Sequence, residues 1–231
     1  MVQREQELQL PVCEKATVIH IRLSQLNLQP SIPATGKFEA LRALSIACFD
    51  FTKLDVERVV SLQCPRLQKL ALEPIHYQNF VKATTKLPGC KTLRIILLSQ
   101  HHEFASIVLH LLRICDGIRR LDIQLLGSEH KVSFSDCPCG LSENKSSEGI
   151  ILNSLEEVNI SYFRKYKDAV NLLRALLRWK FIPRRVSIHA SPLVGSLSVE
   201  TCKKIASFSH CDTRVEFHGW LNGSYGRHVY M

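Results

Sequence analysis

The hydrophobic positions of the chain follow one six-residue pattern that recurs along most of its length. The pattern is L-x-x-L-x-L, with isoleucine, valine or cysteine allowed for leucine, and its apolar and polar residues alternate as in a strand with one buried face. The middle apolar residues of the eight copies are Ile21, Leu44, Leu70, Leu93, Leu121, Val158, Val186 and Val215. Successive middle residues are 23, 26, 23, 28, 37, 28 and 29 positions apart.

Amphipathic segments between these strands predict helices. From Phe104 to Cys115 the apolar residues recur at steps of three and one, which places them on one helical face. A second apolar stripe comprises Ala169, Leu172, Leu173, Leu176 and Leu177. The opposite, solvated face is expected to carry Lys167, Asn171, Arg174 and Arg178, and Pro183 ends the helix. Weaker patterns predict further helices near 54–62, 78–86 and 199–208.

A strand and a helix repeated at intervals of twenty to thirty residues are typical of a solenoid. The pattern therefore predicts an α/β fold, a leucine-rich-repeat horseshoe with irregular strand–helix repeats. An ordinary open α/β sheet also alternates strands and helices. We favour the solenoid, because the same strand formula recurs and no glycine-rich strand-to-helix turn is present.

The predicted organisation has five segments. Residues 1–15 form a flexible N-terminal segment, 16–126 leucine-rich repeats, and 127–150 a mobile polar loop. Residues 151–218 form the terminal repeats, and residues 219–231, which contain Gly219, Gly223 and Gly226, form a loose tail.

Composition narrows the function classes. The 231 residues are 45% hydrophobic and 22% charged, which suits a folded domain with a substantial core. No stretch approaches the roughly 20 apolar residues of a membrane helix, and residues 1–15 lack the apolar core of a secretory signal. The nine cysteines are odd in number and scattered, which favours a reducing compartment, the cytoplasm or the nucleus.

No pattern for catalysis or cofactor binding stands out. Ser, His and Asp are present without a Gly-x-Ser-x-Gly elbow or a phosphate-binding glycine loop, so we do not expect an enzyme or a cofactor. Cys137 and Cys139, with His130 nearby, could begin a zinc site, but a structural site needs four ligands. We interpret them as two loop cysteines and expect no metal.

Strand alternation predicts a binding surface on the concave face of the sheet. The polar neighbours of the inward residues point to the other face. They are Ser45, Lys69, Arg94, Arg120, Asp122, Glu157, Asn159, Arg185, Ser187 and His189. Both charge signs are mixed in this set, which suits a protein partner better than a phosphate backbone. The net charge of +9 and the basic stretch at 164–185 keep a nucleic-acid-binding module as the alternative.

The repeats resemble those of plant F-box proteins. Cys137-Pro-Cys139 followed by Ile151–Phe163 is similar to the FBD region that closes many of these proteins, and so are Ala169–Trp179 and Thr201–Phe208. The resemblance covers roughly residues 38–218 and is most specific from 136 to 208. It implies a substrate-recognition part of a ubiquitin ligase, which binds a protein while other subunits carry out catalysis.

In that family an F-box of about fifty residues contacts the ligase scaffold, and no F-box pattern precedes Thr17. We therefore expect a recognition module that does not contact the scaffold directly. A truncated, non-functional fragment is the other possibility.

Overall fold

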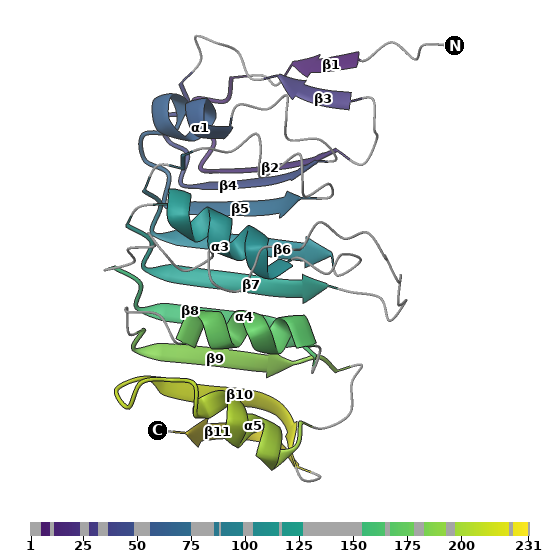
Figure 1. Cartoon of the computed structure of the whole chain (residues 1–231). Coiled ribbons are helices and arrows are strands. Elements are labelled where there is room, and N and C mark those ends of the chain that lie inside the picture. Colours follow the sequence, from purple (N-terminus) through teal and green to yellow (C-terminus); the bar gives the residue numbers. More distant parts are fainter. Residues whose placement is uncertain are drawn as a thin grey trace.

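The computed structural model describes residues 6–9, 12–23, 28–31, 37–48, 56–74, 86–87, 89–98, 104–115, 117–126, 154–164, 167–177, 183–192, 197–221 and 224–230. The fold is α/β, and a nine-stranded open sheet runs the length of the molecule (Figure 1). The strand order is β11-β10-β9-β8-β7-β6-β5-β4-β2, so neighbouring copies of the sequence pattern lie side by side. All neighbours are parallel except β10 and β11.

The strands of this sheet begin close to the residues that the alternation predicts. Their bounds are β2 Val18–Leu23, β4 Ala43–Cys48, β5 Lys69–Pro74, β6 Thr92–Leu98, β7 Arg120–Leu126, β8 Glu157–Phe163, β9 Arg185–Ala190, β10 Arg214–Leu221 and β11 Ser224–Tyr230. From Leu44 to Val215 the middle apolar residues of the pattern pair in one row across the sheet.

The first copy differs from the prediction by two residues. Ile19, and not Ile21, pairs with Leu44, and Ile21 pairs with Ile46. Because side chains alternate with a period of two, a shift of two keeps Ile21 on the same face. The first copy of the pattern is therefore displaced by two residues relative to the others, and Ile21 still lies on the buried face.

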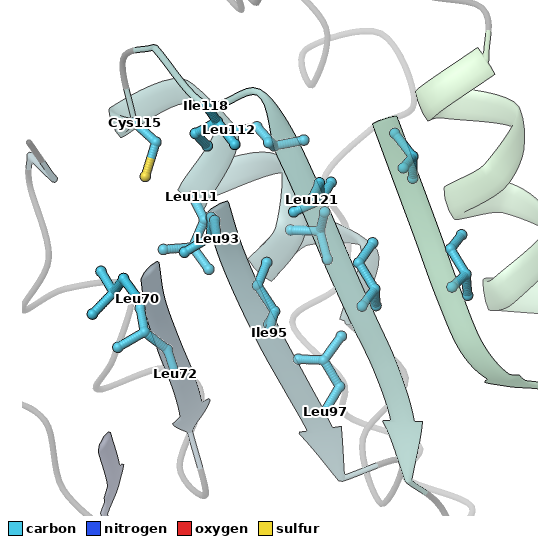
Figure 2. Close-up of a cluster of buried hydrophobic side chains, with 14 of the residues drawn as sticks. Leu70, Leu72, Leu93, Ile95, Leu97, Leu111, Leu112, Cys115, Ile118 and Leu121 are labelled. Carbon is cyan, nitrogen blue, oxygen red and sulfur yellow. The ribbon is translucent and has the colours of Figure 1, made fainter. Parts of the chain in front are cut away.

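The helices form one layer against the apolar face of the sheet. Their bounds are α1 Val56–Arg58, continued by the π-helical turn η1 Val59–Gln63, then α3 Phe104–Ile114, α4 Lys167–Leu177 and α5 Val199–Ala206. Helix α3 contacts α4, and α4 contacts α5. Figure 2 shows how Leu111 and Leu112 of α3 lie against Leu93 and Leu121 of the strands, and all four are essentially inaccessible to solvent.

The buried face predicted for α4 is confirmed, while Asn171 and Arg174 on the predicted solvated face are half-buried, and Arg178 and the side chain of Lys167 lie outside the described residues. The apolar stripe of α4 is buried, and Leu172 and Leu173 have no exposed surface. Arg174 departs from the prediction, because it does not simply extend into solvent. Its guanidinium carbon lies 5.1 Å from the ring centroid of Phe208, just beyond α5, and this cation–π contact joins the two helices.

The expected loose tail is a strand. Residues Ser224–Tyr230 form β11 and pair antiparallel with β10 along its length. The glycines of this segment predict mobility, but Gly219 has a φ of 149°, and a side chain at this position would collide with Ala190. Glycine is here a requirement of close strand packing.

Part of the N-terminal segment is also ordered. Strand β1, Gln6–Gln9, pairs in parallel with β3, Leu28–Ser31, to form a separate two-stranded sheet beyond β2 (Figure 1). The helix expected at 78–86 lies outside the described residues except for Lys86. The polar loop predicted at 127–150, with Cys137 and Cys139, lies wholly outside them.

Candidate functional site

The ten residues selected from the alternation all lie on the sheet face opposite the helices. Each alternates with a residue of the buried core, and the pairing register places the ten in three rows that cross the strands. We call this surface the polar face. It comprises Ser45, Lys69, Arg94, Arg120, Asp122, Glu157, Asn159, Arg185, Ser187 and His189, with the matching residues of β2, β10 and β11.

Asp122 is the centre of one polar cluster on this face. Only 11% of its side chain is exposed. Arg120 Nε and Asn159 Nδ2 each donate to Asp122 Oδ1 at 2.9 Å, and Arg94 Nη2 lies 3.6 Å from Oδ2. Three strands, β6, β7 and β8, thus converge on a single carboxylate. Since an unpaired buried carboxylate would be costly, these partners hold its charge in place.

Glu157 extends the cluster to the next strand. Arg185 Nη2 donates to Glu157 Oε1 at 2.6 Å, and Arg120 Nη1 lies 3.6 Å from Glu157 Oε2. Arg120 therefore links Asp122 to Glu157, and Glu157 links β8 to β9. The structure brings together six of the ten predicted residues in one continuous network across β6 to β9.

The other four predicted residues lie outside this network. Ser45 and Lys69 lie on β4 and β5, toward the β2 end of the face. Ser187 is buried and lies in the row of Asp122, between Asn159 of β8 and Glu216 of β10. His189 stacks on His218 of β10, with ring centroids 4.3 Å apart and planes inclined by 10°.

A second cluster surrounds Glu216 of β10, which is not among the ten predicted residues. The Glu216 side chain is 4% exposed. Arg214 Nε lies 2.8 Å from its Oε1, Arg227 Nη2 donates to the same oxygen, and His218 Nε2 lies 3.5 Å from Oε2. Strand alternation in the sequence is sufficient to place Arg214, Glu216 and His218 on this face. Arg227 could not be found in this way, because its segment is expected to be loose rather than a strand.

Burial and charge act in opposite directions on Glu216. Burial tends to raise the pKa of this carboxyl group, but the hydrogen bond and charge of Arg227, with Arg214 and Arg185, bring the pKa below its ordinary value. Burial and then the neighbouring His218 lower the pKa of His189, and Glu216 opposes them. Glu216 is thus stabilised as a carboxylate, and His189 as a neutral ring.

Exposed aromatic side chains lie at the end of the same face. Trp220 is two residues beyond His218 on β10 and so shares its face, and Tyr225 is its partner on β11. Tyr162 belongs to an irregularity between Ile160 and Phe163, where β8 places Ser161 and Tyr162 opposite His189 alone. Its φ of 60° is unusual for a tyrosine, and bulges of this kind redirect a side chain.

The described part of the chain contains one group of side chains that could act as metal ligands. His210, Cys211 and Asp212 follow one another in the turn before β10, and their ligand atoms lie within 4.8 Å of one another. All three residues are exposed, and a structural zinc site typically has four ligands. The turn alone does not make up such a site.

Comparison of the chain with protein-family models, curated proteins and solved structures finds no match. Among the described residues, no helix is both long and apolar enough to cross a membrane. The arrangement on the polar face offers fixed guanidinium groups and aromatic rings at a surface, which are the side chains that most often anchor a protein partner.

Proposed function

We propose that the chain is a non-catalytic protein-interaction module that binds a protein partner through the polar face. The observation that carries the proposal is a pair of polar clusters in which five arginines contact three carboxylates, the buried Asp122 and Glu216 and the half-buried Glu157. These arginines keep 43–50% of their side chains exposed while the carboxylates fix their positions. Fixed, exposed guanidinium groups lose little entropy when a partner binds.

Regular connections between strands support a leucine-rich-repeat solenoid as the architecture of this module. The residue before a strand accepts a backbone hydrogen bond from the first residue of the next strand, as when Lys69 donates to Arg42 and Arg120 to Lys91. The same connection recurs at Thr92–Gln68, Glu157–Arg119, Arg185–Glu156 and Arg214–Arg184. In solenoids an extended sheet surface of this kind commonly binds proteins.

The cellular role that we propose for this module rests on its resemblance to plant F-box proteins with leucine-rich repeats and an FBD region. In that role the chain selects a protein, and a longer relative would present the protein for ubiquitin transfer. Catalysis would lie in other subunits. The mixed charges of the polar face support a protein partner over a phosphate backbone, since each arginine lies next to a carboxylate.

A quantitative pull-down from plant extract tests the proposal. The baits are the wild-type chain, a face variant with Lys69→Gln and Arg94→Gln, and a control variant with Lys203→Gln and Lys204→Gln. Each variant removes two positive charges. Lys203 and Lys204 are exposed on α5, on the helical side, and Arg94 makes the longest contact with Asp122, so its loss leaves Asp122 bonded to Arg120 and Asn159.

We expect specific partners to be recovered with the wild-type chain and the control variant, and about tenfold less with the face variant. The ligase scaffold is quantified separately, and we expect that other partners are recovered and that the scaffold is not. Equal recovery with all three baits would contradict the use of the polar face. Loss of every partner on nuclease treatment would favour the nucleic-acid alternative.

A further inference from the structure

The end of the polar face on β10 and β11 combines two exposed aromatic rings with two arginines. Trp220 is 54% exposed and Tyr225 71% exposed. Their rings pack edge to face, with centroids 5.9 Å apart and planes inclined by 68°, so the pair has a defined shape. Because the two exposed rings are in contact, they form one apolar patch, and tryptophan and tyrosine are enriched at binding hot spots.

Positive charge lies on the same two strands as this aromatic pair. Arg227 pairs with His218, one row below Trp220 and Tyr225, and Arg214 lies at the other end of β10. Both arginines contact Glu216, whose buried carboxylate neutralises only one of them. These two strands therefore keep a net positive charge on the face that carries the exposed aromatic pair.

We propose that β10 and β11 bind an extended, acidic segment of a partner protein, with one aromatic side chain of that segment against Trp220 and Tyr225. The inference rests on the proposed function and names the partner class for the same face. From Arg214 to Trp220 the strand advances about 20 Å, the length of roughly six extended residues. The acidic residues of the segment then lie over Arg214 and Arg227.

The same side chains argue against single-stranded nucleic acid as the occupant. A nucleic-acid backbone carries a phosphate at every nucleotide, so some phosphates would lie next to Glu216 and Glu157 and be repelled by them. A peptide can place its few carboxylates over the arginines alone.

Fluorescence anisotropy with defined peptides tests this inference on the full chain. The first probe is a fluorescein-labelled peptide with four glutamates preceding one phenylalanine. Matched probes carry glutamine for every glutamate, or alanine for the phenylalanine, and an oligouridine of similar length represents nucleic acid. We expect the first peptide to bind tightest, each substitution to weaken binding about tenfold, and added salt to weaken it further.

Variants of the chain locate the site. Trp220→Ala should weaken binding of the first peptide on the order of thirtyfold, as loss of a hot-spot aromatic residue does. Arg214→Gln should also weaken it, while Lys203→Gln should not, because Lys203 is exposed on α5, on the helical side of the sheet. Circular dichroism and thermal melts confirm that each variant is folded.

Unchanged binding by the Trp220→Ala variant, equal binding of the glutamine peptide, or tighter binding of oligouridine would each overturn the inference. The pull-down separates this failure from that of the proposed function. Partners that depend on Lys69 and Arg94, without any binding of the acidic peptide, would leave the interaction module standing and remove only its assigned partner class.

Discussion

Gly219 of β10 lies so close to Ala190 of β9 that a methyl group on Gly219 would be 2.8 Å from the Ala190 Cβ atom. Two carbon atoms do not pack at that distance. The φ of Gly219, 149°, is also one that residues with a side chain rarely adopt. Close approach and backbone conformation therefore both require glycine where β10 joins the rest of the sheet.

We predict that Gly219→Ala lowers the free energy of unfolding by about 1–3 kcal/mol, because the extra methyl group must displace β9 or β10. Chemical denaturation followed by circular dichroism measures the change. Gly226→Ala is the matched control, since its methyl group would meet only His228 Nε2 at an ordinary 3.8 Å. If the two alanine variants were equally stable, the ordered pairing of β10 with β9 would be contradicted.

The two faces of α4 give a second prediction. Leu173 has no exposed surface, so Leu173→Ala should lower the free energy of unfolding by about 2–5 kcal/mol. Arg174→Ala should cost about 0.5–1 kcal/mol, more than an ordinary surface change, because it removes the cation–π contact with Phe208. Thermal and urea denaturation of the two variants provide the comparison.

A double-mutant cycle isolates the contact of Arg174 with Phe208. If this contact joins α4 to α5, Arg174→Ala and Phe208→Ala together should cost less than the sum of the two single changes. Lys203→Ala, an exposed change on α5, serves as the control and should be within about 0.5 kcal/mol of wild type. If the changes in unfolding free energy of the two single variants added up exactly to that of the double variant, the contact between Arg174 and Phe208 would not contribute to stability.

Much of the fold follows from local alternation. A strand with one buried face needs only a period of two, and this property is sufficient to assign Asp122, Glu157 and Arg185 to the polar face. The same property cannot determine register to better than two residues, which explains why Ile19 rather than Ile21 pairs with Leu44.

Features that depend on distant partners could not be predicted from the sequence. The segment that contains β11 is rich in glycine, which predicts flexibility when it is considered alone, and its order depends on its pairing with β10. The contact of Arg227 with Glu216 depends on that pairing, so the second polar cluster could not be predicted in full. Arg174 shows the same limit, because helical periodicity identifies a polar face but not the neighbouring element that covers it.

Buried cysteines provide a third prediction. Cys64, Cys90 and Cys202 are buried, and burial raises the pKa of each thiol to about 11, so few thiolates form at neutral pH. We expect these three to react with iodoacetamide only when the chain unfolds. The exposed Cys13 and Cys211 should react in the native protein. Peptide-resolved mass spectrometry distinguishes the sites, and fast native labelling of Cys202 would contradict the packing of α5 on the sheet.

The stacked histidines and Glu216 predict a loss of stability toward acid in two steps. The folded-state pKa of His189 lies below its ordinary value of 6.5, so the unfolded chain binds more protons there. The contribution of His189 to the free energy of unfolding is complete above about pH 6.5, and it declines as the pH falls from that value toward the folded-state pKa. The lowered pKa of Glu216 adds a second loss below its ordinary value of 4.5, as pH falls through its folded-state pKa.

The His189→Gln variant separates the two steps. It should flatten the dependence of unfolding free energy on pH just below 6.5, because no group at this position then gains a proton on unfolding, and leave the loss below 4.5 in place. Denaturation midpoints measured between pH 8 and pH 3 test this. His20→Gln, at an exposed histidine of β2 across the same face, is the control and should keep the wild-type profile. An unchanged slope near pH 6 in His189→Gln would show that the stack with His218 does not govern this protonation.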